Sequence, residues 1–185
     1  MSTPTFAVLT ASLPSRSALL EECRASVQAQ TLPADHLVGI DAQRRGPALT
    51  RNDLAASSDA DWFLPLDDDD LLDPDYLEVL APHLDGADIV YPWCRVTGRE
   101  MWSPNRLYRP EALLRFNFIP VTALVRHSLW DELGGFRSVA YEDFDLWRRA
   151  VGAGARIRCV PEVLWTYRIN AAGGTSRNPE WGKAA

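Results

Sequence analysis

The feature that most restricts the fold is an apolar run that ends in four consecutive aspartates. Residues Trp62–Leu66 are all apolar, and Asp67–Asp70 follow at once. Neighbouring carboxylates repel one another, and a buried one is costly unless a positive charge compensates it. Because Leu71 and Leu72 continue the apolar sequence, a solvated acidic surface explains the cluster less well than a loop at the end of a buried strand. The pattern therefore predicts a strand followed by a cation-binding loop.

The acidity of the chain is concentrated at this point. Residues 67–75 hold six of the 25 acidic residues, and the other acidic residues balance the 19 lysines and arginines, so the net charge is −6. This distribution argues against a protein that grips duplex phosphates. The hard cations Mg²⁺ and Mn²⁺ prefer carboxylate oxygens, and Mg²⁺ sites often combine one or two carboxylates with substrate phosphates.

Strand-like and helix-like segments alternate through the first half of the chain. The expected strands are 6–10, 37–41 and 62–66, and the expected helices are 16–30, one opening at Pro47, and one from Asp73 to Leu84. This alternation is typical of a parallel α/β sheet whose strand carboxyl ends face one crevice. Pro65 cannot donate a ladder hydrogen bond, so we expect its strand to lie near an edge or to bend there.

The second half of the chain is less regular. The sequence predicts strands at 89–91, 121–125, 156–160 and 163–167, helices at 128–133 and 142–151, and loops over 93–117. With 185 residues, the chain is long enough for one sizeable core. We expect a single domain over 1–170, with halves 1–85 and 86–170, followed by a flexible tail at 171–185.

The cysteines and the apolar runs indicate the compartment. Cys23, Cys94 and Cys159 are far apart and form no C-x-x-C pair, so neither a disulfide framework nor a thiolate zinc site is expected. No secretory signal and no membrane-spanning run is evident. We therefore expect a reducing, cytoplasmic location.

Two other kinds of acidic site fit the loop poorly. An EF-hand counted from Asp67 would need glycine where Leu72 stands, and Pro74 follows soon after. An aspartyl-phosphate phosphatase would use the first aspartate as nucleophile and usually carries a threonine where Leu71 stands.

Several short motifs occur in an order that resembles the family 2 glycosyltransferases, which use the GT-A fold. The resemblance covers nearly the whole chain and rests on Thr10, Gln30–Thr31, Asp41, Arg51–Asn52, Leu66–Asp70, Gly134–Phe136, Glu142–Leu146 and Tyr167–Arg168. It implies a mostly parallel central sheet flanked by helices. Residues 1–85 would form a Rossmann-like half that binds a nucleotide-sugar, and residues 86–170 a less regular half that binds the acceptor.

The resemblance also implies roles in the nucleotide-sugar site. Thr10, Ser12 and Asp41 would line the pocket for the base and ribose, and Arg51 would approach the nucleotide or its diphosphate. Asp67 and Asp68 would also belong to this site.

Further roles concern the metal and the chemistry. Asp67 and Asp69 would hold Mg²⁺ or Mn²⁺, although Asp68 and Asp70 could be the working pair because identical residues give no internal marker. Asp143 would be the catalytic base, with Glu142 beside it contacting the acceptor or the donor. Since both begin a helix, we expect the helix dipole to keep Asp143 ionised.

The implied reaction transfers a sugar from a nucleoside-diphosphate sugar to an acceptor hydroxyl, with inversion by direct displacement. The acceptor is a glycan, lipid, protein or small molecule, and no feature indicates a nucleic-acid partner. A bound cation would stabilise the departing diphosphate, and a carboxylate would take the proton of the hydroxyl.

Two departures from the family pattern keep other functions open. Only nine residues separate Asp41 from Arg51, so the nucleotide pocket is shortened. Asn170 stands where many members carry a histidine as a further metal ligand, and an amide oxygen is a weaker ligand. One alternative is a catalytically weak module that binds a nucleotide-sugar. A nucleotidyltransferase is another, although no glycine-rich phosphate loop supports it.

Overall fold

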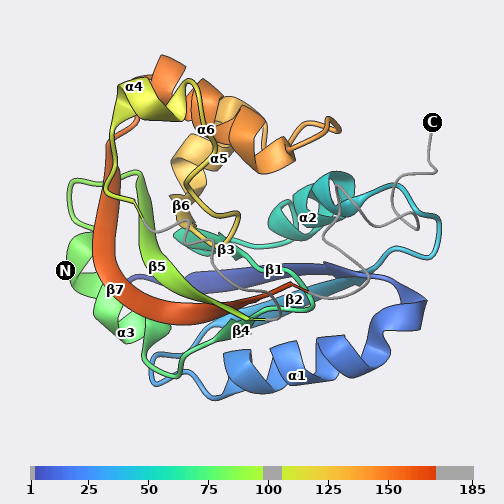
Figure 1. Ribbon diagram of the computed structural model, residues 1–185. Coiled ribbons are helices and arrows are strands. Elements are labelled where there is room, and N and C mark those ends of the chain that lie inside the picture. Colours follow the sequence, from blue (N-terminus) through green and yellow to red (C-terminus); the bar gives the residue numbers. More distant parts are fainter. Residues whose placement is uncertain (1–2, 98–105, 170–185) are drawn as a thin grey trace.

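The computed structural model describes residues 3–97 and 106–169, and a seven-stranded sheet forms the centre of this part (Figure 1). The strand order is β2-β1-β3-β6-β5-β7-β4. The strands are β1 (Phe6–Ser12), β2 (Asp35–Ile40), β3 (Trp62–Pro65), β4 (Leu71–Leu72), β5 (Ile89–Thr97), β6 (Leu124–Arg126) and β7 (Ile157–Arg168).

Helices cover both faces of this sheet. The α-helices are α1 (Ser17–Gln28), α2 (Pro47–Ala55), α3 (Tyr76–Leu80), α4 (Pro110–Leu113), α5 (His127–Leu133) and α6 (Glu142–Gly152). Two short 3₁₀ helices are η1 (Pro14–Arg16) and η2 (Ala81–His83). In Figure 1, α1 and α3 lie on one side of the sheet, and α2, α5 and α6 lie on the other. The expected α/β class with flanking helices is confirmed.

The sheet is mostly parallel, as expected, and among the described residues it also contains three short antiparallel pairings. Strands β2, β1 and β3 are parallel, as are β5 and β7, whereas β6 pairs antiparallel with both β3 and β5, and β4 pairs antiparallel with β7. The alternating first half therefore follows the expectation. The short strands β6 and β4 supply the antiparallel pairings.

Pro65 does not mark an edge strand. Strand β3 lies inside the sheet between β1 and β6, but β6 pairs only with Trp62 and Phe63. Pro65 is the last residue of β3 and lies beyond the β6 pairing, so its missing N–H interrupts no antiparallel rung.

Most of the other differences fall in the second half of the chain, and one falls in the first. The two strands expected at 156–160 and 163–167 are one strand, β7, whose register against β5 shifts around Trp93. Strand β5 extends to Thr97, and α4 lies in the same region, which we expected to consist of loops. The two-residue strand β4 was not expected.

The two core layers follow from the alternation of side chains along β1. Phe6 and Val8 pack toward α1 and α3, in a cluster with Cys23 and Tyr76, whereas Ala7 and Leu9 face the α2, α5 and α6 side. Each fully buried large apolar side chain contributes about 1.5–3 kcal/mol. The sheet is thus fixed from both faces, and the strand ends at its carboxyl edge are held in place.

None of the helices in the described ranges combines the length and apolar character that crossing a membrane requires.

Candidate functional site

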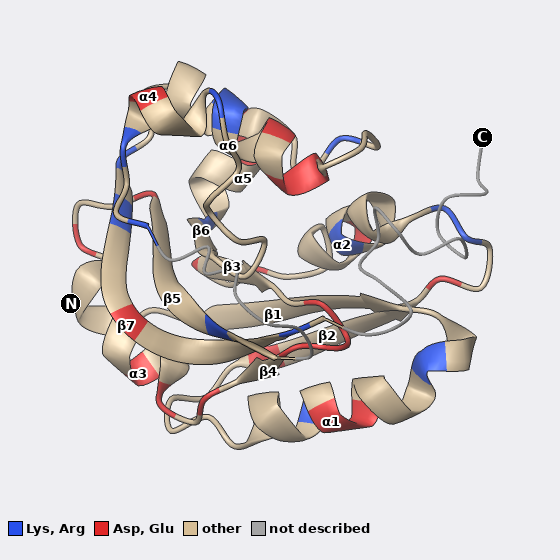
Figure 2. Ribbon diagram, in the orientation of Figure 1, with Lys and Arg blue, Asp and Glu red and all other residues tan. Residues whose placement is uncertain are grey.

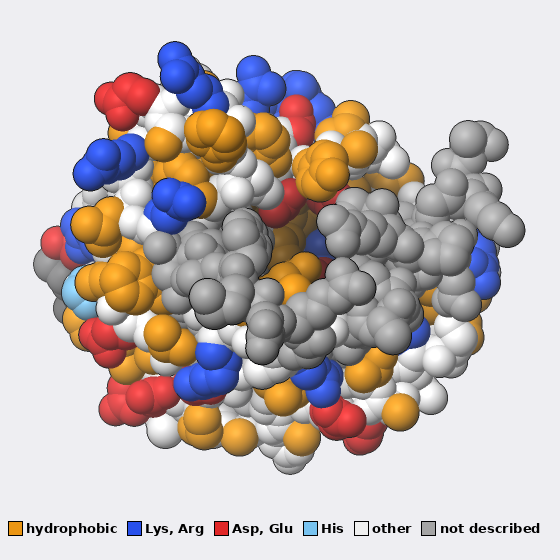
Figure 3. Space-filling view, in the orientation of Figure 1, with side chains coloured by type: hydrophobic (Ala, Val, Ile, Leu, Met, Phe, Trp, Pro, Cys, Tyr) orange, Lys and Arg blue, Asp and Glu red, His pale blue; other side chains and the backbone are white. Residues whose placement is uncertain are grey.

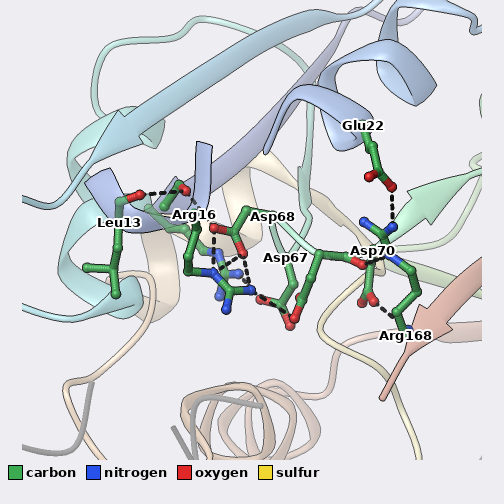
Figure 4. Close-up of polar contacts among 10 residues, drawn as sticks. Leu13, Arg16, Glu22, Asp67, Asp68, Asp70 and Arg168 are labelled. Atoms are coloured by element: carbon green, nitrogen blue, oxygen red, sulfur yellow. Dashed lines mark hydrogen bonds and ion pairs between the residues drawn. The ribbon is translucent and has the colours of Figure 1, made fainter. Parts of the chain in front are cut away.

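The acidic loop is held at both ends by the sheet. It follows β3 directly and leads into β4, which pairs with β7 through Leu71 and Thr166. The N–H of Asp70 donates to the carbonyl of Asp67 at 3.1 Å and closes the turn. In Figure 4, Arg16 points toward Asp68, and Arg168 lies beside Asp70. The loop is therefore an ordered part of the carboxyl edge, as the sequence predicted.

The four aspartates have different partners. Asp67 accepts a hydrogen bond from Arg51. Asp68 accepts one from the Ser12 hydroxyl at 2.5 Å and is gripped by Arg16, whose Nε lies 2.9 Å from both carboxylate oxygens.

The next two aspartates contact Arg16 and the backbone of Arg168. Asp69 Oδ2 lies 2.8 Å from Arg16 Nη2, and Asp70 Oδ1 accepts the backbone N–H of Arg168 at 2.9 Å. The four aspartates are the same residue type, but each has a different set of partners in the structure.

Three of these residues fit a divalent cation. Asp67, Asp69 and Asp70 each offer a carboxylate oxygen, and these oxygens all lie within 4.8 Å of one another. Asp70 is fully buried, and its Oδ2 has no hydrogen-bond partner among the described residues. Burial and the neighbouring charge of Asp67 raise the pKa of both Asp69 and Asp70. A hard cation among these oxygens would compensate the buried charge.

This grouping contains the whole of one expected pair and one member of the other. Asp67 and Asp69 lie together as one alternative had it, and Asp70 joins them. Asp68 faces Ser12 and Arg16 and is not part of the three-residue group. Asn170 lies outside the described residues.

Arg51 joins the acidic loop to the start of α6. Its side chain is 1% exposed, Nη2 contacts Asp67 Oδ1, and Nη1 lies 3.7 Å from Glu142 Oε1. Burial alone would lower the pKa of Arg51. The negative charges of Asp67 and Glu142 have the larger combined effect, so the pKa of Arg51 is raised. We expected Arg51 to approach the nucleotide. The structure buries the guanidinium between two carboxylates from distant segments.

The start of α6 places Asp143 beside two hydrogen-bond donors. Asp143 Oδ1 accepts from the N–H of Phe144 at 2.8 Å, and Oδ2 accepts from Asn117 Nδ2 at 2.9 Å. Burial nevertheless raises the pKa of Asp143, and the charge of Asp67 adds to the effect. Burial likewise raises the pKa of Glu142. A raised pKa makes the ionised form of Asp143 a stronger base than an exposed aspartate.

Asn52, the neighbour of Arg51, fixes the turn that precedes this helix. Its side chain donates to the carbonyl of Phe136 at 2.8 Å and accepts from the N–H of Phe136 at 2.9 Å. Gly135 has a positive φ of 66°, and a Cβ there would lie 2.4 Å from Asn52 Oδ1. These contacts explain why Arg51–Asn52 and Gly134–Phe136 occur together: both tie α2 to the segment that leads into α6.

Ser12 and Asp41 lie together where β1 and β2 end. The N–H of Asp41 donates to the carbonyl of Ser12, and Asp41 Oδ2 accepts from the N–H of Gly46 at 2.8 Å. Asp41 Oδ1 is buried and has no hydrogen-bond partner among the described residues. This oxygen is a candidate for contact with a ligand.

Thr10 does not join this group. Its side chain is fully buried, with Oγ1 2.9 Å from His36 Nε2 and 4.0 Å from Cys23 Sγ of α1. The hydroxyl therefore lies beneath α1.

Three side chains at the site were not assigned roles from the sequence. Arg16 and Asn117 gave no signal, because each meets its partner only through the fold. Arg168 belonged to the Tyr167–Arg168 motif, and its guanidinium contacts the carbonyl of Asp69 and the carboxylate of Glu22.

The site faces a hollow in the molecular surface. Figure 2 shows the acidic start of α6 and the acidic loop on either side of α2. In Figure 3 the surface is hollowed near the centre of this face, where acidic and basic side chains are visible between hydrophobic ones. The arrangement suits a polar ligand that contacts a cation on one side and a basic carboxylate on the other.

Comparisons with known proteins agree with this architecture. The family described as "Glycosyl transferase family 2" matches residues 40–146. The search of curated proteins found no match.

Solved structures match the fold over most of the chain. Staphylococcus aureus TarS 1-349 in complex with UDP-GlcNAc matches with a TM-score of 0.75 at 15% identity, covering 98% of this chain and 61% of that one. The mannosyltransferase PcManGT from Pyrobaculum calidifontis, in complex with GDP-Man and Mn²⁺, matches with a TM-score of 0.69 at 17% identity, covering 95% and 60%. The chain thus spans about 60% of the length of these structures. From the matched residues and the shared architecture, the chain belongs to glycosyl transferase family 2 and has a GT-A-like fold.

Proposed function

We propose that the chain transfers a sugar from a nucleoside-diphosphate sugar to an acceptor hydroxyl and inverts the anomeric centre by direct displacement. The observation that carries this proposal is the pair of contacts made by buried Arg51, with Asp67 at one end and Glu142 at the other. These contacts bring the acidic loop and the start of α6, which carries Asp143, to one site, although 74 residues lie between Asp67 and Glu142. A displacement at an anomeric carbon needs both groups, one for the leaving group and one for the nucleophile.

Asp67, Asp69 and Asp70 would hold Mg²⁺ or Mn²⁺, and Asn170 is a further proposed ligand. When bound, the cation supplies Lewis-acid stabilisation of the negative charge that develops on the departing diphosphate. The donor set consists of hard oxygens, as these cations prefer, and Asp70 Oδ2 is a buried oxygen without a hydrogen-bond partner among the described residues.

Asp143 accepts the proton of the acceptor hydroxyl in this proposal. The hydrogen bonds from Asn117 and the Phe144 N–H orient the carboxylate. Burial raises the pKa of Asp143 and so strengthens it as a base. Glu142, held near Arg51, is placed to contact the acceptor or the donor sugar.

Ser12 and Asp41 would line the nucleotide side of the site, with Asp41 Oδ1 as the ligand-facing atom. Thr10 has no part in this proposal because its hydroxyl is buried under α1. The matched structures contain UDP-GlcNAc and GDP-Man, so UDP-sugars and GDP-sugars are the first donors to test, followed by dTDP-sugars.

The test combines donor binding with turnover. A thermal-shift screen with and without Mn²⁺ identifies the donor, because a ligand that binds only the folded state raises the melting temperature. Release of nucleoside diphosphate is then measured for the wild type and for Asp143→Asn. We expect Asp143→Asn to lose release while keeping metal-dependent donor binding. Asp131→Asn, at a side chain that is 71% exposed, is the control and should keep both.

The outcomes separate the competing functions. Metal-dependent binding without release from any donor would make the chain a nucleotide-sugar-binding module. Release of pyrophosphate would indicate nucleotidyl transfer. Equal loss of binding and release in Asp143→Asn would give Asp143 a structural role.

A further inference from the structure

Arg16 lies at the boundary between the candidate cation ligands and the rest of the acidic loop. It ends η1, and its side chain is 10% exposed. Its Nη2 lies 2.7 Å from Asp68 Oδ1 and 2.8 Å from Asp69 Oδ2. Asp69 belongs to the group that fits a cation, whereas Asp68 does not. One guanidinium therefore holds a ligand carboxylate and a non-ligand carboxylate at the same time.

The two carboxylates do not hold Arg16 equally. Asp68 accepts from both Nε and Nη2 of Arg16 and is itself fixed by the Ser12 hydroxyl. Asp69 is contacted through Nη2. Loss of the Asp69 contact would leave the paired hydrogen bonds to Asp68 in place, so the guanidinium would keep a charged partner in its buried position.

The other arginines that contact this loop have different arrangements. Arg51 is buried between Asp67 and Glu142, and the guanidinium of Arg168 contacts the carboxylate of Glu22. Among the described residues, Arg16 is thus the arginine whose charge is shared between two carboxylates of the loop itself.

We propose that Arg16 is a positioning residue that sets the affinity of the acidic loop for divalent cations by competing for Asp69. The proposal rests on the cation site of the proposed function. Like charges close to one another repel, and a cation bound by Asp69 would share that carboxylate with the guanidinium. Cation binding therefore weakens the attraction between Arg16 and Asp69, while Asp68 keeps the guanidinium beside the site.

The direction of the effect distinguishes this role from a structural one. Loss of a residue that merely supports the loop would weaken cation binding, because the ligands would be less well placed. Loss of a competing charge would strengthen it. We expect Arg16→Gln to bind Mn²⁺ on the order of tenfold more tightly than the wild type, and Arg16→Lys, which keeps the charge, to stay close to the wild type.

Mn²⁺ binding without nucleotide, followed by electron paramagnetic resonance of the free ion, is the direct measurement. Arg45→Gln is the matched control, because Arg45 pairs with Asp53 at an exposed position. The affinity of this variant for Mn²⁺ should equal that of the wild type. Circular dichroism checks that each variant is folded.

If Arg16→Gln does not fold, the same substitution is tested in a protein that already carries Asp68→Asn. The double variant Arg16→Gln/Asp68→Asn leaves no unpaired charge at this position, and it should bind Mn²⁺ more tightly than Asp68→Asn alone.

Unchanged or weaker binding in folded Arg16→Gln, with a wild type that binds Mn²⁺, would overturn the role of Arg16 and leave the cation site standing. Absence of Mn²⁺ binding in both proteins would overturn the cation site of the proposed function as well.

Discussion

His36 gives the fold a pH dependence that can be measured without knowing the substrate. Its ring contacts Thr10 Oγ1 at 2.9 Å. Burial, helped by the positive charge of Arg24, lowers the pKa of His36 from 6.5 to about 4. A histidine whose pKa is lower in the folded state than in the unfolded state contributes stability above the unfolded pKa. That stability is lost as the pH falls from about 6.5 toward about 4.

The size of the effect follows from these two pKa values. Between pH 7 and pH 5, protonation of the unfolded state alone would lower the free energy of unfolding by about 2 kcal/mol. The ring is partly exposed, and solvent screening reduces the value. We therefore expect a loss of about 1 kcal/mol that is due to His36.

The perturbation is His36→Gln, whose amide can keep a hydrogen bond to Thr10 and cannot be protonated in this range. Urea unfolding at pH 7 and at pH 5 gives the free energy of unfolding of the wild type and the variant. The raised pKa values of Asp69, Asp70, Glu142 and Asp143 act in the opposite direction, but they are common to both proteins and cancel in the comparison.

We expect the wild type to lose about 1 kcal/mol more than His36→Gln when the pH is lowered from 7 to 5. His83→Gln replaces a histidine on η2 and should behave as the wild type. An identical pH dependence in the wild type and His36→Gln would refute the reasoning that burial keeps His36 neutral.

Two further predictions concern the approach to α6. Gly135→Ala should lower the free energy of unfolding by about 3 kcal/mol in urea unfolding, because the new Cβ would lie 2.4 Å from Asn52 Oδ1 at a positive φ. Gly134→Ala, where nothing lies within 4 Å of the new Cβ, should lose only about 1 kcal/mol, and equal losses would contradict the steric account. Asn117→Ala should move the acidic limb of the pH–rate profile to higher pH, because the hydrogen bond from Asn117 favours the charged form of Asp143. An unmoved limb would show that another group titrates there.

The sequence was most informative where a single segment carries its own pattern. The apolar runs predicted β1, β2 and β3, and Pro47 correctly marked the start of α2. Strand β4 and helix α4 have two and four residues, too few for a periodic signal. The strand order could not be read either, because the pairings of β6 and β7 depend on contacts between segments far apart in sequence.

In the site, too, the sequence predicted the residue types within a segment but not the contacts between distant segments. The four aspartates and Glu142–Asp143 were evident as residue types, but four identical side chains carry no sign of which of them meets Arg16. Thr10, whose side chain lies under α1 and not beside Asp41, could have been placed from the sequence. It follows Phe6 and Val8 in the period-two alternation of β1 and so shares their face, which packs against α1.

Strand β7 has a consequence for how far the chain can be shortened. The family match ends at residue 146, and a fragment ending there would keep every aspartate of the loop as well as Asp143. It would lack the partner strand of β4 and the backbone N–H that binds Asp70. The smallest unit able to hold the acidic loop in this geometry therefore extends to Arg168, beyond the residues that carry the proposed chemistry.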